Sequence, residues 1–123
     1  MKLSNGQRPI QILVAIGHND LRASLVVMLA TQANREVVGQ AANGPAALAA
    51  AQACPPDVVV LDMRLPDAVG PRLIRHIHLL APAARVILLT PEDGPEYGEL
   101  AARWGAAAHL SWDRVDQALL RHI

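Results

Sequence analysis

Short apolar runs alternate five times with amphipathic stretches, and this alternation limits the fold more than any other feature of the chain. Several runs are apolar throughout, which is typical of strands that are covered on both faces. We expect strands at residues 10–16, 36–41, 57–62, 85–90 and 106–110. We expect helices around the apolar stripe at 21–29, at 45–53, at 71–80, around the stripe at 97–104, and at 114–123.

Strands that alternate with helices predict a parallel sheet with helices on both faces. The predicted fold class is therefore α/β, a flavodoxin-like doubly wound (βα)5 fold whose parallel five-stranded sheet has the order 2-1-3-4-5. A length of 123 residues suits a single domain. We assign residues 1–9 to a polar N-terminal tail and residues 10–123 to this domain.

Composition and charge exclude several classes of function. The chain has 11 basic and 11 acidic residues and a formal net charge of zero, so we expect no direct binding of nucleic acid by this domain. No apolar run approaches the ~20 residues that a membrane span needs, so we expect no membrane association. The single cysteine, Cys54, cannot form an internal disulfide, which favours a reducing, cytoplasmic setting.

Asp62 is the most informative polar residue of the chain. It follows the apolar run Val58–Leu61 and precedes a loop. In an open α/β sheet, ligands and chemistry gather at the carboxyl ends of the strands. Thr90 holds the corresponding place at the end of the next predicted strand. The sequence therefore predicts a functional site at this edge of the sheet.

The chain resembles the receiver domains of two-component response regulators, especially those that precede a LuxR-type helix-turn-helix output domain. The resemblance is carried by residues 10–25, residues 36–42, PDVVVLDMRLP at 56–66, RVILLT at 85–90 and GAAAHL at 105–110. It extends without an obvious gap from about residue 10 to residue 123, which marks this segment as a receiver-like domain. It implies that Asp62 is the phosphoacceptor position and that Thr90 and His109 are the switch positions.

Three positions depart from the pattern of this family. Its two metal-binding acids fall on Ile16 and Gly17, and its lysine falls on Trp112. Receivers accept a phosphoryl group from a histidine kinase, and Mg²⁺ neutralises the charge of the transition state. Isoleucine and glycine supply no anionic oxygen, and an indole offers one neutral N–H. We therefore expect weak or absent Mg²⁺ binding, no metal or other cofactor, no catalytic residues, no enzymatic activity, and an atypical receiver that works without phosphorylation.

Trp112 is the most distinctive of these substitutions. The lysine that it replaces points into the acidic pocket of an ordinary receiver. We expect the indole to pack over Ile16 and to close part of the former site. Its N–H is then expected to lie near Asp62 or Thr90.

Two helices carry more apolar residues than one buried stripe needs. The first helix has a stripe of four apolar residues, Leu21, Leu25, Met28 and Leu29. Val26 and Val27 fall outside this stripe, and Leu120 falls outside the stripe of the last helix. The resemblance implies dimerisation through helices one and five, or through helix four, strand five and helix five. We therefore expect a homodimer with Val26, Val27 and Leu120 as candidate contacts.

Three hypotheses of function follow. The first is a degenerate receiver that controls a transcriptional output through dimerisation or ligand binding. The second is an active phosphorelay receiver that is phosphorylated on Asp62. The third is a small-molecule-binding module of flavodoxin-like fold that uses the emptied pocket. The expected partners are a second copy, a histidine kinase or small-molecule ligand, and a C-terminal DNA-binding output domain outside this chain.

Overall fold

The computed structural model describes residues 8–123, so most of the predicted tail, residues 1–9, lies outside the described residues. The strands are β1 (Ile10–Ala15), β2 (Arg35–Ala41), β3 (Val58–Asp62), β4 (Arg85–Thr90) and β5 (Ala108–Ser111). The helices are α1 (Asn19–Ala30), α2 (Gly44–Ala53), α3 (Gly70–Leu80), α4 (Pro95–Trp104) and α5 (Val115–His122), with a 3₁₀ turn η2 at Trp112–Arg114. The strands pair in parallel in the order β2-β1-β3-β4-β5, which confirms the predicted fold class. Within this described part, no helix is both long and apolar enough to cross a membrane.

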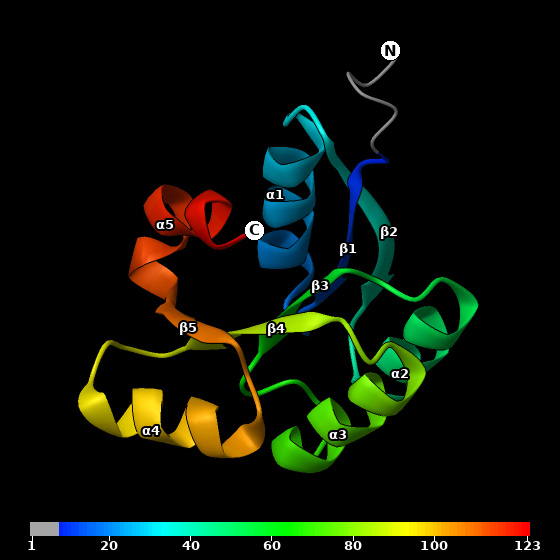
Figure 1. Cartoon of the computed structure of the whole chain (residues 1–123). Helices are drawn as coiled ribbons and strands as arrows, with labels where there is room; N and C mark the ends of the chain where they lie inside the picture. The colour runs from blue at the N-terminus through cyan, green and yellow to red at the C-terminus, as the bar shows by residue number, and fades with distance from the viewer. Residues whose placement is uncertain (1–7) are drawn as a thin grey trace.

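The sheet divides the interior into two hydrophobic clusters. Figure 1 shows α1 and α5 on one face of the sheet and α2, α3 and α4 on the other. Side chains of each strand alternate between the two faces, because successive residues of a strand point in opposite directions. The α1–α5 cluster includes Ile12, Val14, Val60, Ile87 and Leu89 from the strands. The α2–α3–α4 cluster includes Leu13, Val59, Leu61, Val86 and Leu88. Both faces are covered, as the apolar strands predict.

The last strand starts later than the sequence predicts. The N–H of Ala106 donates to the carbonyl of Ala101, so Ala106 still belongs to the end of α4. Gly105 ends that helix with a φ of 91°, a left-handed conformation that glycine adopts without strain. Pairing with β4 therefore begins at Ala108 instead of Ala106.

Helix α1 is rotated from the orientation that its apolar stripe predicts. Leu21 is 42% exposed, so its assignment to the buried stripe is wrong. Leu25 and Leu29 are buried, and Val26 packs partly against the same cluster. The side chain of Arg22, one turn before Val26, reaches the carbonyl of Ile16 at the end of β1. Leu120 of α5 also packs partly against the cluster, so the prediction that it and Val26 lie outside the buried stripes is wrong too.

Two glycines allow close packing around the loop that follows β3 and the start of α3. The N–H of Gly44 donates to the carbonyl of Pro66 at 2.9 Å. A Cβ at Gly44 would overlap the carbonyl oxygen of Asp67, and one at Gly70 would overlap the ring of Trp104. Glycine at position 44 therefore lets α2 lie against the loop that follows Asp62, and glycine at position 70 lets Trp104 of α4 lie against the start of α3.

Asp57 holds the opposite edge of the sheet together. Its carboxylate accepts from the N–H of Gln11 at 2.8 Å and pairs with the guanidinium of Arg8 at 2.8 and 3.1 Å. Burial by itself raises the pKa of Asp57, but the Gln11 and Arg8 hydrogen bonds and the Arg8 charge together outweigh it and hold this pKa below its ordinary value.

A folded-state pKa below the unfolded value of about 3.9 stabilises the protein above that pH, and this contribution is lost as the pH falls through the folded-state pKa. We expect Asp57→Asn to lower the free energy of unfolding at pH 7 by about 1 kcal/mol, an amount discounted for solvent screening. The deficit should shrink below about pH 3, where the wild-type carboxyl is protonated as well. Urea unfolding of wild type and Asp57→Asn, at pH 7 and below about pH 3, measures this difference in the free energy of unfolding. Asp93→Asn, which removes an exposed pair with Arg114, is the control and should have little effect; a deficit that is constant with pH would contradict the assignment.

Candidate functional site

The carboxyl ends of four strands meet at one edge of the sheet. The register pairs these residues: Ala15 with Leu61, Asp62 with Leu89, and Thr90 with Ser111. Ile16 follows the first of these pairs, and Trp112 follows the last. The predicted site positions therefore gather at one edge, on β1, β3, β4, β5 and the loops that follow them.

Asp62 ends β3 and is half-buried. One of its carboxylate oxygens, Oδ1, accepts from the N–H of Arg64 at 2.9 Å. Its backbone carbonyl accepts from the N–H of Leu65 at 3.1 Å, which closes the turn after the strand. The carboxylate is thus anchored by its own loop and remains partly open to solvent.

Two uncharged residues follow β1 at the positions where the family has its metal-binding acids. Ile16 is completely buried in the α1–α5 cluster, and its carbonyl accepts from a guanidinium nitrogen of Arg22 at 2.8 Å. A Cβ at Gly17 would lie only 2.7 Å from Cδ of Pro66. Arg22 and Pro66 were not predicted from the sequence. The sequence gives little indication that these two residues belong to the site, because the first turn of α1 and the β3–α3 loop reach this strand end only in the folded chain.

These residues do not fit the Mg²⁺ site of a receiver. Mg²⁺ needs near-octahedral oxygen ligands, normally including several carboxylates. At the metal positions only Asp62 carries a carboxylate, because Ile16 and Gly17 have no oxygen in their side chains. Across residues 8–123 no three Asp, Glu, His or Cys side chains come together in a metal-binding arrangement.

The side chains at the two switch positions, Thr90 and His109, contact neighbouring backbone carbonyls and helix α4, respectively. Thr90 is fully buried, and its hydroxyl lies 3.1 Å from the carbonyl oxygen of Glu92 and 3.3 Å from that of Leu110, to which it donates. His109 is half-buried and packs on α4, since its Cε1 lies 3.1 Å from the place of a Cβ at Gly98. Both side chains therefore hold β5 against its neighbours.

Trp112 lies on the α1 side of the sheet. Its half-buried indole packs against the α1–α5 cluster, which includes Ile16. It lines a groove of about 230 Å³ between α1 and α5, together with Leu21, Ser24, Leu25, Met28, Val115 and Asp116. Among residues 8–123, no hydrogen bond joins the indole N–H to Asp62 or Thr90, and a place near these two residues stays a prediction. Trp112 begins the 3₁₀ turn that follows β5, and its indole packs against the same cluster as Leu110.

Comparison with known proteins agrees with this geometry. Residues 12–123 match the response regulator receiver domain family. The chain is 32% identical over 114 residues to the DNA-binding transcriptional activator DevR/DosR of Mycobacterium tuberculosis, covering 93% of this chain and 52% of that protein. It is 38% identical over 106 residues to a protein-glutamate methylesterase/protein-glutamine glutaminase of Anaeromyxobacter dehalogenans, covering 86% of this chain and 31% of that protein.

A solved structure shows the same fold. The receiver domain of the response regulator NarL from Mycobacterium tuberculosis is similar with a TM-score of 0.81 and 29% sequence identity, covering 94% of this chain and 97% of that chain. The chain thus spans about half, or less, of its two longer relatives, and in NarL it matches the receiver domain. The family match, the identities and the shared fold together show that the chain belongs to the response regulator receiver domains of two-component systems.

Proposed function

We propose that this receiver works without phosphorylation and transmits its signal by associating with a second copy of itself. The observation that carries the proposal is the apolar replacement of the metal site. Ile16 is buried among hydrophobic side chains and Gly17 lies against Pro66, so no charged partner replaces the missing acids at these positions. The direct test is phosphate uptake from a small phosphodonor, described in the Discussion.

We also propose that the output is transcriptional and that the domain is not itself an enzyme. The relative DevR/DosR is named as a DNA-binding transcriptional activator, and this chain covers 52% of it. The methylesterase relative is matched over only 31% of its length. The coding sequence beyond Ile123 tests this proposal: a helix-turn-helix segment supports it, and a catalytic domain contradicts it.

A second candidate function is an active receiver that accepts phosphate on Asp62 from a histidine kinase. One observation favours it, the partly exposed carboxylate at the end of β3 in the position of the family's phosphoacceptor. A kinase could supply groups that this chain lacks, because arginine or lysine from a partner can stabilise a transferring phosphoryl group. Transfer of label from a phosphorylated kinase to wild-type protein, but not to Asp62→Asn, would support this candidate.

Helix α1 presents an apolar stripe that suits a contact with a second copy. Ala23, Val27 and Ala30 are exposed at the spacing i, i+4, i+7, and Val27 is 65% exposed. Its ionisable residues, Asp20 and Arg22, lie near its beginning. An apolar stripe with little charge often marks a protein contact. Of the three candidate contacts, Val27 is therefore the best test.

We expect Val27→Glu to shift the protein from dimer to monomer without unfolding it. Val27 is exposed in the single chain, so glutamate costs the fold little, whereas burial of an unpaired charge at the contact should weaken association at least about tenfold. Sedimentation velocity measures the mass. Val69→Glu is the matched control, since Val69 is also an exposed valine, 57% accessible, at the start of α3. A dimeric Val27→Glu variant would move the contact to another face, and a monomeric wild type would refute the proposal of a dimer.

A further inference from the structure

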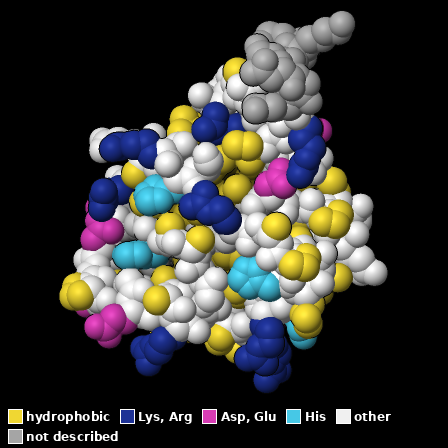
Figure 2. Space-filling view, in the orientation of Figure 1, with side chains coloured by type: hydrophobic (Ala, Val, Ile, Leu, Met, Phe, Trp, Pro, Cys, Tyr) yellow, Lys and Arg dark blue, Asp and Glu magenta, His cyan; other side chains and the backbone are white. Residues whose placement is uncertain are grey.

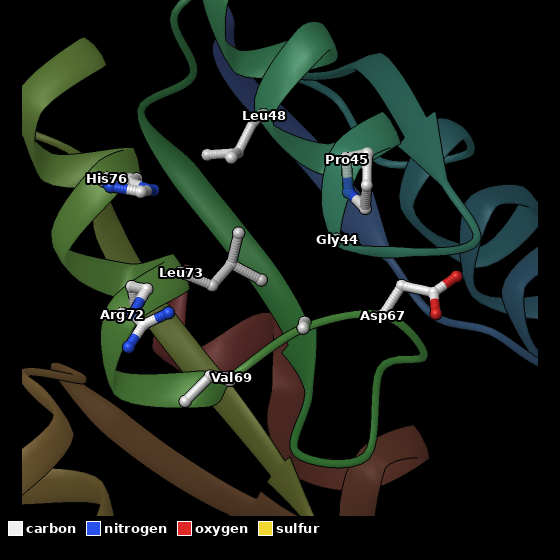
Figure 3. A pocket seen from close by; sticks show the side chains of 9 residues that line it. Gly44, Pro45, Leu48, Asp67, Val69, Arg72, Leu73 and His76 are labelled. Carbon is white, nitrogen blue, oxygen red and sulfur yellow. The ribbon is translucent and has the colours of Figure 1, made fainter.

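A cavity of about 490 Å³ lies between the first turns of α2 and α3, beside the loop that joins β3 to α3 (Figure 3). Its volume falls within the range typical of sites for small organic molecules. The residues that line it are Gly44, Pro45, Leu48, Asp67, Ala68, Val69, Arg72, Leu73 and His76. None of the predicted site positions lines it, so the cavity is separate from the phosphoacceptor site.

The floor of the cavity is apolar. Figure 3 shows the side chains of Leu48 from α2 and Leu73 from α3 directed into the space between the two helices. Val69 stands at the rim and leaves 57% of its surface in water. A concave apolar surface that ends in a large exposed aliphatic side chain suits the apolar body of a ligand.

One wall of the cavity is basic. Arg72 and His76 are four residues apart on α3, so they lie on the same side of this helix. Both are exposed, and among residues 8–123 neither has a hydrogen-bond or ion-pair partner from another side chain. Neither α2 nor α3 contains an acidic residue. The charge of Arg72 is therefore available to an anion.

The acidic side chains lie away from this wall. Asp67 is at the other end of the cavity, and Figure 3 shows its carboxylate directed away from Leu73. On the face shown in Figure 2, basic side chains lie along the lower edge and also at the upper left and centre, and the few acidic ones lie at the left and near the top. The electrostatic arrangement thus favours a ligand with one negative end.

We propose that the α2–α3 cavity binds a small organic anion with an apolar body, of the class of aromatic carboxylates. The carboxylate pairs with Arg72 beside His76, because guanidinium groups bind carboxylates through two parallel hydrogen bonds. The ring lies on Leu48 and Leu73, under Val69. Such a ligand can occupy the cavity whether or not Asp62 accepts phosphate, so this proposal and the proposed function are tested separately.

Titration of the ¹⁵N-labelled protein with 2-naphthoate tests the site. We expect saturable shifts of amide resonances concentrated in residues 44–48 and 67–76, the two segments that line the cavity. The neutral analogue 2-naphthamide has the same ring without the charge and is expected to bind about tenfold more weakly. Shifts that do not saturate, that centre on the α1–α5 groove, or that are equally strong for both probes would overturn the proposal.

Two exposed arginines of α3 give a matched pair of variants. Arg72 lines the cavity, whereas Arg75 lies on the same helix outside it. Arg72→Gln should weaken 2-naphthoate binding about tenfold and leave 2-naphthamide binding unchanged, and Arg75→Gln should change neither. Equal losses in both variants would show diffuse attraction to a basic helix and would overturn the assignment of Arg72.

A third variant tests the cavity itself without changing charge. Val69→Trp places a large ring at the rim, where the native side chain is exposed and the fold should tolerate the change. We expect it to block both probes. Undiminished binding of both probes to this variant would place the ligand outside the cavity.

Discussion

Wild-type protein incubated with phosphoramidate and Mg²⁺ is expected to gain phosphate on Asp62 at least about 10⁴ times more slowly than an ordinary receiver. Loss of one preorganised electrostatic partner commonly lowers a rate by roughly 10²–10³, and here both the metal acids and the lysine are replaced. Intact-mass spectrometry over a time course measures the uptake. Asp62→Asn gives the background, and rapid uptake by wild type but not by this variant would contradict the proposed function.

Restoration of the missing groups sharpens this test. Trp112→Lys alone should leave the rate at background, because the metal acids are still absent. The combination of Ile16→Asp, Gly17→Asp and Trp112→Lys should recover only part of the rate. A Cβ at Gly17 lies 2.7 Å from Cδ of Pro66, so this loop must move before an acid can fit. Ile16→Asp also places a carboxylate in a hydrophobic cluster, which should lower stability.

The second large effect concerns Gly44, where a single methyl group should destabilise the protein. A Cβ at this position would overlap the carbonyl oxygen of Asp67, a backbone atom that cannot move without its loop. We expect Gly44→Ala to lower the free energy of unfolding by about 2–3 kcal/mol, as overpacking of a tight contact does. Urea unfolding at neutral pH measures the change.

Gly98→Ala is the matched control for this experiment. The same methyl group in the interior of α4 meets the ring edge of His109 at 3.1 Å, a side chain that can rotate away. Alanine is also favoured over glycine inside helices by about 1 kcal/mol. We expect equal or slightly higher stability than wild type. If Gly44→Ala were as stable as Gly98→Ala, the contact between α2 and the β3–α3 loop would not be tight.

The fold could be predicted because its signals are local and repeated. Apolar strands covered on both faces and helices between them leave few arrangements other than a parallel doubly wound sheet. Strand ends in such a sheet meet at one edge, so Asp62 and Thr90 were placed together without any knowledge of distances. The boundary of β5 was missed, because the hydrogen bond from Ala106 to Ala101 extends the end of α4 by two residues beyond its last helical position.

The errors concern side-chain direction, which depends on tertiary packing. Leu21 belongs to an apolar stripe in the sequence, yet it is exposed in the structure, whereas its neighbour Arg22 reaches the Ile16 carbonyl from the same turn. The sequence also gives no indication of which way Trp112 turns once β5 has ended. The α2–α3 cavity was not predicted at all, because Arg72 and Leu48 become neighbours only after two helices pack.

The two tryptophans lie on opposite sides of the sheet, so the fluorescence of each one reports on a different surface of this small domain. Trp104 packs against Gly70 at the start of α3, one turn from residues that line the α2–α3 cavity. Trp112 lines the groove between α1 and α5 on the other side of the sheet. Emission from a Trp112→Phe protein therefore reports events beside α3, and emission from a Trp104→Phe protein reports events beside α1. Each single-tryptophan variant, in a sample of its own, can thus test one of the two proposals, ligand binding beside α3 or association through α1, without any added dye.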